Sequence, residues 1–244
     1  MTGVQTCALP ISEFDMFLSS DYSQMELRVM AHISGDKTLQ QAFINNEDIH
    51  TRVAADINGI SLEEVTPYMR KTAKAVIFGI IYGISGFGLG ENLEISPKEA
   101  KEFIDKYYEL YPGVKKYMDD KIKEAYEVGY VKTLFGRKRV IEELQNKNFM
   151  IRQSGERIAL NTPIQGTGAD ILKKAMVEID KAFEVNDIKS KMLLQIHDEL
   201  IFDVIKEEKD KLEKIVKDTM ENCVKIDVPF KVSVDYGNNW YETK

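Results

Sequence analysis

The sequence has little cysteine and no long apolar run. Cys7 and Cys223 are the only two cysteines among 244 residues, which argues against a disulfide framework and fits a reducing cytoplasm. The longest uncharged run, residues 75–90, contains five glycines and is shorter than the roughly 20 residues that a membrane span needs. No stretch near Met1 joins a basic start to an apolar run, so no secretion signal is predicted. We therefore expect a cytoplasmic protein without a membrane partner.

The sequence also lacks an excess of basic charge, since 33 Lys and Arg residues face 40 Asp and Glu residues and the formal net charge at pH 7 is −7. This balance argues against a nonspecific nucleic-acid binder, whose affinity comes from neutralising phosphates. Residues 132–157 are a local exception, with seven basic residues against three acidic ones. The basic residues there are Lys132, Arg137, Lys138, Arg139, Lys147, Arg152 and Arg157. On charge alone, a solvated loop is the simpler interpretation of this segment.

The first eleven residues, MTGVQTCALPI, show no apolar periodicity and do not lead into the pattern that follows. Back-translated from a GTG start, they can be spelled as a common sequencing-adapter read. We therefore interpret residues 1–12 as a non-native leader without function, and we expect that the native protein continued upstream. A short disordered native tail is the alternative interpretation.

Apolar patterning predicts strands near both ends of the chain and helices between them. The predicted strands are residues 16–21, 192–196, 200–205 and 230–234, with a basic hairpin at 129–140. The predicted helices are residues 24–33, 37–45, 50–57, 68–82, 97–108, 114–128, 148–160, 167–183 and 209–222. A break is expected near Pro163, and a loop is expected after the helix within 75–90. The pattern indicates an α/β fold of the α+β type, in which a helical block is inserted into a small antiparallel sheet.

Two carboxylates stand at the ends of predicted strands. Asp21 ends the first strand, and Asp198 lies at a hairpin tip beside His197 and Glu199. Phosphoryl transfer with two metal ions needs at least two carboxylates on rigid backbone. Each aspartate taken alone is more often a solvated turn residue. The pair also leaves nucleases and phosphatases open as interpretations.

One predicted helix carries a stripe of two cations and two aromatic rings. Arg70, Lys74, Phe78 and Tyr82 are four residues apart, so each step turns only about 40° around the helix and the side chains share one face. Cations can meet a triphosphate, and aromatic rings can pack on a sugar or base. A helix with a basic start and a buried end is the simpler alternative.

Four motifs resemble those of the family A DNA polymerases. DYSQMELR at residues 21–28 resembles motif A, RKTAKAVIFGIIYG at 70–83 resembles motif B on the fingers helix, and QIHDE at 195–199 resembles motif C. RIALNTPIQGTGAD at 157–170 is similar to the palm helix along the primer–template minor groove. The motifs occur in the family's order and at comparable spacing over residues 13–244. Four such motifs in this order are highly specific, and they resemble those of the bacterial members of this family.

The resemblance implies a Mg²⁺-dependent, DNA-directed DNA polymerase that transfers deoxynucleotides from dNTPs to a primer 3′-OH in DNA replication and repair. Asp21 and Asp198, with the Tyr22 carbonyl, would bind two Mg²⁺ ions, and Glu199 would support that site. One ion would lower the pKa of the primer 3′-OH, and the other would hold the triphosphate and the leaving pyrophosphate. Lys74 would give a proton to the pyrophosphate.

The resemblance also implies a set of nucleotide contacts. The implied nucleotide-binding residues are Gln24, Glu26, His50, Arg70, Lys74, Phe78 and Tyr82. The two cations and His50 would contact the phosphates, and Phe78 would pack on the sugar. Glu26, paired with Tyr82, would close the space beside the sugar C2′ and exclude a ribose hydroxyl.

Contacts with the duplex are implied for a further set of residues. Arg157, Asn161, Gln165 and His197 would contact the minor groove, where the acceptors are nearly the same for all correct base pairs. Such contacts check the geometry of a pair without reading its sequence. The implied partners are primer–template DNA and dNTPs, and the implied state is a monomer.

The family's organisation implies a palm in two parts, residues 13–35 and 157–244, and fingers at 36–156. The thumb, an upstream palm segment and the proofreading and 5′-nuclease domains would be missing, so we expect a truncated fragment whose ancestry is clearer than its activity in isolation. A two-metal nuclease would explain Asp21 and Asp198 but not the stripe on residues 70–82. A nucleic-acid-binding remnant without catalysis, or a chain that does not fold alone, is the other alternative.

Overall fold

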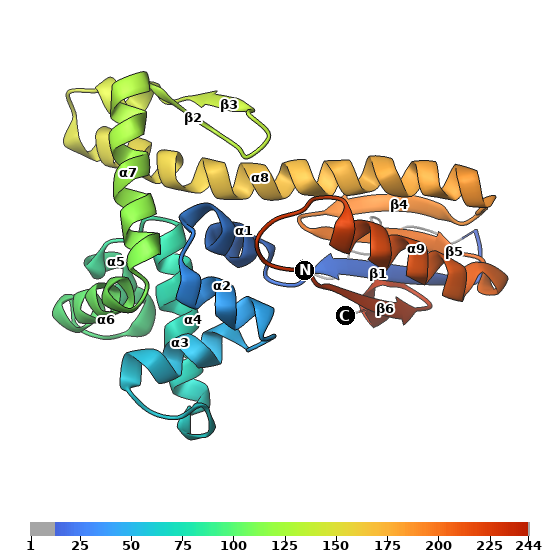
Figure 1. Ribbon diagram of the computed structural model, residues 1–244, viewed down its shortest axis with the longest axis horizontal. Coiled ribbons are helices and arrows are strands. Elements are labelled where there is room, and N and C mark those ends of the chain that lie inside the picture. The colour runs from blue at the N-terminus through green and yellow to red at the C-terminus, as the bar shows by residue number, and fades with distance from the viewer. Residues whose placement is uncertain (1–12, 244) are drawn as a thin grey trace, which may run out of the picture. The chain divides into compact units, whose positions relative to one another are not determined.

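The computed structural model describes residues 13–243 and divides into two compact units (Figure 1). The sheet unit comprises the described residues of Met1–Met25, Gly168–Lys225 and Pro229–Lys244, and the helical unit comprises Glu26–Thr167 and Ile226–Val228. The leader predicted at 1–12 lies outside the described residues. The boundaries between the two units lie after Met25 and after Thr167. The family's organisation predicted these boundaries after residues 35 and 156. The assignment of the two units as palm and fingers stays a prediction.

The sheet unit contains the predicted small antiparallel sheet. Its strands are β1 (Met16–Tyr22), β4 (Lys191–Ile196), β5 (Glu199–Val204) and β6 (Val232–Gly237). They are arranged in the order β4-β5-β1-β6, and every neighbouring pair is antiparallel. The first strand of the chain is therefore central and pairs with two strands from the other end of the sequence. This confirms the α+β class and the assembly of the sheet from distant segments.

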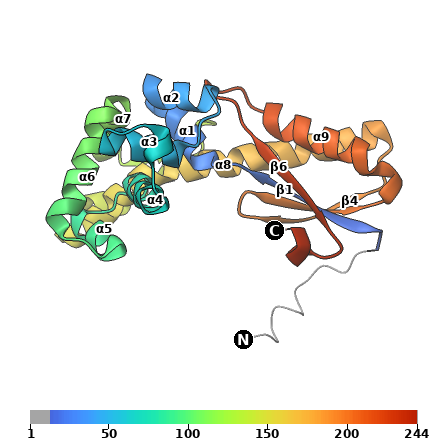
Figure 2. The same cartoon turned by 90° about the horizontal axis from the view of Figure 1, so that it is seen from below.

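The two faces of the central strand have different neighbours. Tyr22 reaches α9 (Lys209–Asn222), where its hydroxyl donates to the Met220 carbonyl at 2.6 Å, and Ser20 contacts the Met220 sulfur at 3.2 Å. Side chains alternate along a strand, so Ser19 and Asp21 point to the opposite face. Helix α9 lies on one side of the strands and the C-terminal turn η4 (Trp240–Thr243) on the other (Figure 2). The predicted metal ligand Asp21 is thus on the face away from α9.

The helical unit contains, within its described residues, seven shorter helices, the first half of the long helix Phe149–Asn186 and one short hairpin. The helices are α1 (Met25–Ser34), α2 (Lys37–Ile44), α3 (Ile49–Asn58), α4 (Pro67–Ile81), α5 (Gly86–Leu93), α6 (Pro97–Leu110) and α7 (Pro112–Val128). The hairpin is β2 (Tyr130–Lys132) and β3 (Lys138–Val140), with 3₁₀ turns η1 (Leu62–Glu64) and η2 (Glu142–Gln145) in the unit. A further 3₁₀ turn, η3 (Lys206–Glu208), belongs to the sheet unit. Side-chain caps define several helix starts, including the reciprocal bonds between Ser96 and Glu99 at the start of α6.

Helix α8 (Phe149–Asn186) is continuous, so the predicted break near Pro163 is wrong. Proline has no N–H and costs about 3 kcal/mol in a helix interior, but packing on both sides of Pro163 outweighs this cost. Ala159 and Ile164 are fully buried before and after the proline, and Ile171 is fully buried further along. Thr167 also donates its hydroxyl to the Pro163 carbonyl. No helix within residues 13–243 is long and apolar enough to cross a membrane.

A helix also forms where a loop was expected. Helix α5 begins after Ser85, whose hydroxyl accepts a hydrogen bond from the Gly88 amide at 3.2 Å. A Cβ atom at Gly90 would lie 2.9 Å from the Ile95 carbonyl oxygen. Gly90 therefore permits a close approach between two backbone segments, whereas the glycine content of the sequence predicted a loop.

Candidate active site

The two predicted metal-binding aspartates meet in the sheet unit. Asp21 lies near the end of β1, directly opposite Glu199 in the antiparallel register. Asp198 lies in the turn between β4 and β5, and its carbonyl accepts a hydrogen bond from the Tyr22 amide at 3.4 Å. The Asp21 and Asp198 carboxyl groups are close enough to interact directly. The fold thus brings together two carboxylates from opposite ends of the sequence.

The environment of Asp21 favours a cation. Burial, followed by the charges of Asp198 and Glu199, raises the pKa of Asp21 to about 6. Its Oδ1 atom is buried and has no hydrogen-bond partner among residues 13–243. A buried carboxylate oxygen without a donor is costly, and a divalent cation would supply the missing positive partner. The site therefore fits such an ion.

The available ligands fit magnesium in particular. Within the part of the chain that the structure describes, no group of three or more His, Cys, Asp or Glu side chains has the spacing of a metal site. A cation between Asp21 and Asp198 would need main-chain oxygen and water as its other ligands. Mg²⁺ accepts this set, because it keeps several waters and is usually held by one or two carboxylates.

Glu199 is held by two donors from the same face of the sheet. Its side chain is nearly buried, with 9% of the residue exposed. The Glu199 Oε1 atom accepts hydrogen bonds from the Ser19 hydroxyl at 2.6 Å and from the Trp240 indole N–H at 3.0 Å. This arrangement is compatible with the supporting role predicted for Glu199, which stays a prediction.

Tyr22 fixes the backbone next to the aspartates. Its ring is buried and meets the Phe230 ring edge-on, with 5.6 Å between centroids. The buried ring and the hydroxyl bond to α9 anchor the end of β1. The role predicted for the Tyr22 carbonyl as a metal ligand is a main-chain role and depends on this anchoring.

Gln24 and His197 flank the aspartates in an unusual backbone conformation. Both have a φ of 55°, in the left-handed region that side chains other than glycine rarely adopt. Gln24 lies in the turn between β1 and α1, and the exposed His197 lies in the turn between β4 and β5. Each turn is therefore tightly bent beside a predicted metal ligand.

The predicted stripe on α4 is present in the helical unit. The Lys74 ammonium is 6.0 Å from the centroid of the Phe78 ring. The rings of Phe78 and Tyr82 stack with centroids 6.1 Å apart and 27° between their planes. The cations and rings thus share one face, as the four-residue spacing predicted, and Tyr82 caps the helix end.

His50 and Arg70 are joined through Asp48. Asp48 caps α3, accepting hydrogen bonds from the His50 and Thr51 amides, and it pairs with the Arg70 Nε at 2.7 Å. The His50 ring lies 6.0 Å from the Phe78 ring. Burial, with contributions from the Arg70 and Lys74 charges, lowers the pKa of His50 to about 4, so the imidazole is neutral at pH 7.

The predicted pairing of Glu26 and Tyr82 is confirmed. The Tyr82 hydroxyl donates a hydrogen bond to the Glu26 Oε2 at 2.7 Å. The bond links the first helix of the unit to the end of α4. The discrimination against ribose that the resemblance assigned to this pair stays a prediction.

Arg157, Asn161 and Gln165 follow one another on α8 at four-residue intervals. Arg157 and Gln165 are exposed, and the Asn161 Oδ1 is buried without a hydrogen-bond partner among residues 13–243. These three residues belong to the helical unit, whereas His197 belongs to the sheet unit. Their predicted contacts with a minor groove stay predictions.

The basic segment is more ordered than a solvated loop. Arg137 donates to the Gly166 carbonyl at 3.0 Å, and Arg139 donates to the Thr162 hydroxyl at 3.2 Å. Both bonds fasten the β2–β3 hairpin to α8. The Lys138 ammonium lies 4.4 Å from the Tyr130 ring centroid.

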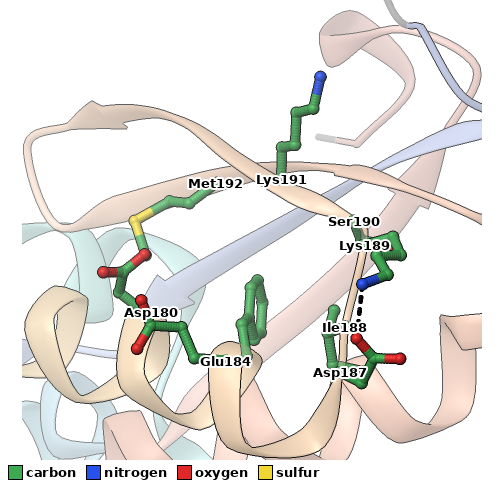
Figure 3. Close-up of a pocket in the computed structure, with 9 residues that line it drawn as sticks. Asp180, Glu184, Asp187, Ile188, Lys189, Ser190, Lys191 and Met192 are labelled. Carbon is green, nitrogen blue, oxygen red and sulfur yellow. Dashed lines mark hydrogen bonds and ion pairs between the residues drawn. The ribbon is translucent and has the colours of Figure 1, made fainter.

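A pocket of about 550 Å³ lies between the end of α8 and the start of β4 (Figure 3). Its walls mix carboxylates such as Asp180 and Glu184 with the ammonium of Lys189, which pairs with Asp187 (Figure 3). The predicted site residues do not line this pocket. The chemistry of the carboxylate pair therefore has no connection with it.

Three residues that hold predicted site residues in place were not identified from the sequence. Asp48 has the local signal of a helix cap, namely an aspartate just before an apolar-periodic segment, but its bond to Arg70 comes from tertiary packing. Ser19 and Trp240 have no local signal, because they reach Glu199 from another strand and from the C-terminal turn.

The sheet unit presents paired carboxylates at strand ends, and the helical unit presents a helix face with two cations and two rings. Groups of both kinds are used in phosphoryl transfer. The family model for DNA polymerase family A matches residues 3–242 of the chain. The chain therefore belongs to DNA polymerase family A, and the resemblance of its four motifs is confirmed. The match also extends into the segment predicted as a leader.

Individual relatives agree with the family. The chain is 52% identical over 229 residues to a DNA polymerase I of Caldicellulosiruptor bescii, covering 94% of this chain and 27% of the relative. It is 49% identical over 241 residues to DNA polymerase I of Bacillus subtilis, covering 99% of this chain and 27% of that protein. A solved structure described as the POL domain of Pol1 from M. smegmatis in complex with DNA primer-template and dNTP superposes with a TM-score of 0.92 at 41% identity. It covers 96% of this chain and 41% of that one. The chain thus spans about a quarter of the length of these curated relatives.

Proposed function

We propose that this chain provides the nucleotidyl-transfer site of a cytoplasmic DNA-directed DNA polymerase that acts in replication and repair. The reaction is the template-directed transfer of a deoxynucleotide from a dNTP to a primer 3′-OH. The primer oxygen attacks the α-phosphorus, the bond to pyrophosphate breaks, and the 3′-OH proton is lost. The observation that carries the proposal is the proximity of the Asp21 and Asp198 carboxyl groups, together with a buried Asp21 oxygen that has no hydrogen-bond partner in the described part of the chain.

Two Mg²⁺ ions are the proposed cofactor. Asp21 and Asp198 would hold them, with the Tyr22 carbonyl as a further ligand. When bound, the ions supply positive charge that lowers the pKa of the primer hydroxyl and neutralises the leaving pyrophosphate. Glu199 would support the site through its fixed position, without being a main ligand.

The helical unit would bind the nucleotide. Arg70, Lys74 and His50 would contact the triphosphate, the first two by charge and the neutral His50 by a hydrogen bond. The exposed Lys74 ammonium would donate the proton that the leaving pyrophosphate takes up. Phe78 would pack on the sugar, and Gln24 would contribute from the turn after β1.

Primer–template DNA is the proposed macromolecular partner of a monomeric enzyme. Arg157, Asn161, Gln165 and His197 would donate to acceptors in the minor groove, which are shared by all correct pairs. The basic hairpin of residues 130–140 adds positive charge to a chain that is acidic overall, and such charge binds phosphates irrespective of sequence.

Removing the Lys74 charge tests whether α4 binds a triphosphate. We expect Lys74→Ala to weaken dATP binding by the full chain in Mg²⁺ by about tenfold, which corresponds to about 1.4 kcal/mol. Isothermal titration calorimetry measures this. Lys71→Ala is the matched control, because Lys71 is an exposed cation on the same helix but off the stripe.

The control should bind dATP as tightly as the wild type. An equal loss of dATP affinity in both variants would indicate general electrostatic attraction. It would contradict the proposed role of the stripe on α4 in binding the triphosphate. If the wild-type chain bound no dATP, the proposed polymerase function would be contradicted, and a two-metal nuclease would explain the aspartates better.

A further inference from the structure

Hydrogen bonds from Ser19 and Trp240 hold the Glu199 carboxylate beside the two aspartates. Glu199 is the cross-strand partner of Asp21 and follows Asp198 in the chain, so three carboxylates lie close together. A flexible glutamate here would turn towards any cation held by the two aspartates. Instead, the Ser19 hydroxyl and the Trp240 indole N–H both donate hydrogen bonds to its Oε1 atom. Ser19 precedes Asp21 by two positions, so the glutamate leans diagonally along β1.

The position of Trp240 is itself set by a network in the C-terminal turn. Glu242 accepts hydrogen bonds from the Asn238 amide at 2.9 Å and from the Asn239 side chain at 2.6 Å. Thr243 donates its hydroxyl to the Trp240 carbonyl at 2.8 Å. A Cβ atom at Gly237 would lie 2.6 Å from the Glu242 Cβ, so glycine is needed for the turn to fold back this tightly. The indole N–H is therefore a fixed donor.

We propose that Trp240 is a positioning residue that keeps Glu199 out of the ligand shell of the cation at Asp21 and Asp198, and that it thereby sets the ion preference of the site. This inference rests on the proposed metal binding by those aspartates. Mg²⁺ needs few protein ligands and keeps its waters, whereas Ca²⁺ takes six to eight oxygen ligands in flexible geometry. When Glu199 is held away from the ion, the site offers few protein oxygens and favours Mg²⁺. When Glu199 is released, it adds carboxylate oxygens to the site and favours Ca²⁺.

Calorimetric titration of the full chain with MgCl₂ and with CaCl₂ tests this without any assay of activity. We expect Trp240→Phe, which removes the indole donor and keeps an aromatic ring, to shift the ratio of the two dissociation constants towards Ca²⁺ by about fivefold or more. Ser19→Ala removes the second donor and should shift the ratio in the same direction. Tyr236→Phe is the matched control, because it deletes a hydrogen bond to a different carboxylate of the sheet unit, Glu213, and should leave the ratio unchanged.

The double variant Trp240→Phe with Glu199→Gln should return the ratio to the wild-type value, since the freed side chain no longer carries a charge. Circular dichroism confirms that each variant is folded. An unchanged ratio in folded Trp240→Phe and Ser19→Ala chains would overturn the inference while leaving the metal site intact. If the wild-type chain bound neither ion, the proposed metal site itself would fail, and this inference with it.

The indole gives a second readout, because Trp240 is the single tryptophan of the chain. Its fluorescence reports directly on the charge that it contacts. We expect Glu199→Gln to shift the emission maximum, and Glu213→Gln to leave it unchanged. Identical emission in the wild type and Glu199→Gln would show that the contact is not made in solution.

Discussion

Asp198→Asn is expected to lower the rate of Mg²⁺-dependent primer extension by about a thousandfold or more. A bound metal contributes several kcal/mol of transition-state stabilisation, and about 4 kcal/mol corresponds to a thousandfold in rate. The amide of asparagine has nearly the same shape as the carboxylate but no charge to hold the ion. Single-turnover extension measures the effect in a full-length version, made by joining this chain to the corresponding upstream part of the Bacillus subtilis relative.

Duplex binding separates loss of catalysis from loss of structure. The Asp198→Asn protein should bind primer–template DNA as the unmutated protein does. Asp218→Asn is the control, because Asp218 is an exposed carboxylate on α9 of the same unit, and its extension rate should be unchanged. Equal extension by Asp198→Asn and the unmutated protein would refute the proposed catalytic role.

Glu26→Ala is expected to relax discrimination against ribonucleotides by about a hundredfold. The Glu26 side chain is held by the Tyr82 hydroxyl at 2.7 Å, so it occupies a fixed volume. We propose that this volume lies beside the sugar C2′, where a ribose hydroxyl would clash and would displace a hydrogen bond. The ratio of kcat/KM for dNTP and for the matching rNTP, measured in the same full-length version, gives the effect.

Tyr82→Phe separates the steric role of Glu26 from its hydrogen bond. It keeps the ring that stacks on Phe78 and removes only the hydroxyl that holds the carboxylate. We expect a smaller loss of discrimination than for Glu26→Ala, because the glutamate is still present but mobile. Unchanged discrimination in Glu26→Ala would show that another group excludes the ribose hydroxyl.

Local sequence patterns predicted the features that depend on the helical repeat and on where the strands end. The four-residue spacing on α4 placed Lys74, Phe78 and Tyr82 on one face, and the rings stack there. An apolar run that ends on Asp21 and a hairpin tip at Asp198 predicted carboxylates at strand ends, and the antiparallel register puts those ends together. The roles of these residues in chemistry stay proposals.

Features that depend on tertiary packing were not predictable from local patterns. Pro163 signals a helix break, but buried residues on both sides of it keep α8 continuous. The glycines of α5 signal a loop, yet Gly90 serves a close backbone contact. Trp240 and Ser19 reach Glu199 across the sheet, and nothing in the sequence around them marks that contact.

Anomalous diffraction from crystals of this chain soaked in MnCl₂ tests the metal site most directly, because Mn²⁺ takes the same hard oxygen ligands as Mg²⁺. We predict an anomalous peak within about 2.2 Å of carboxylate oxygens from both Asp21 and Asp198, with no Glu199 oxygen as a ligand. A manganese ion bound elsewhere, with none at this pair in a crystal whose site is open to solvent, would contradict the account.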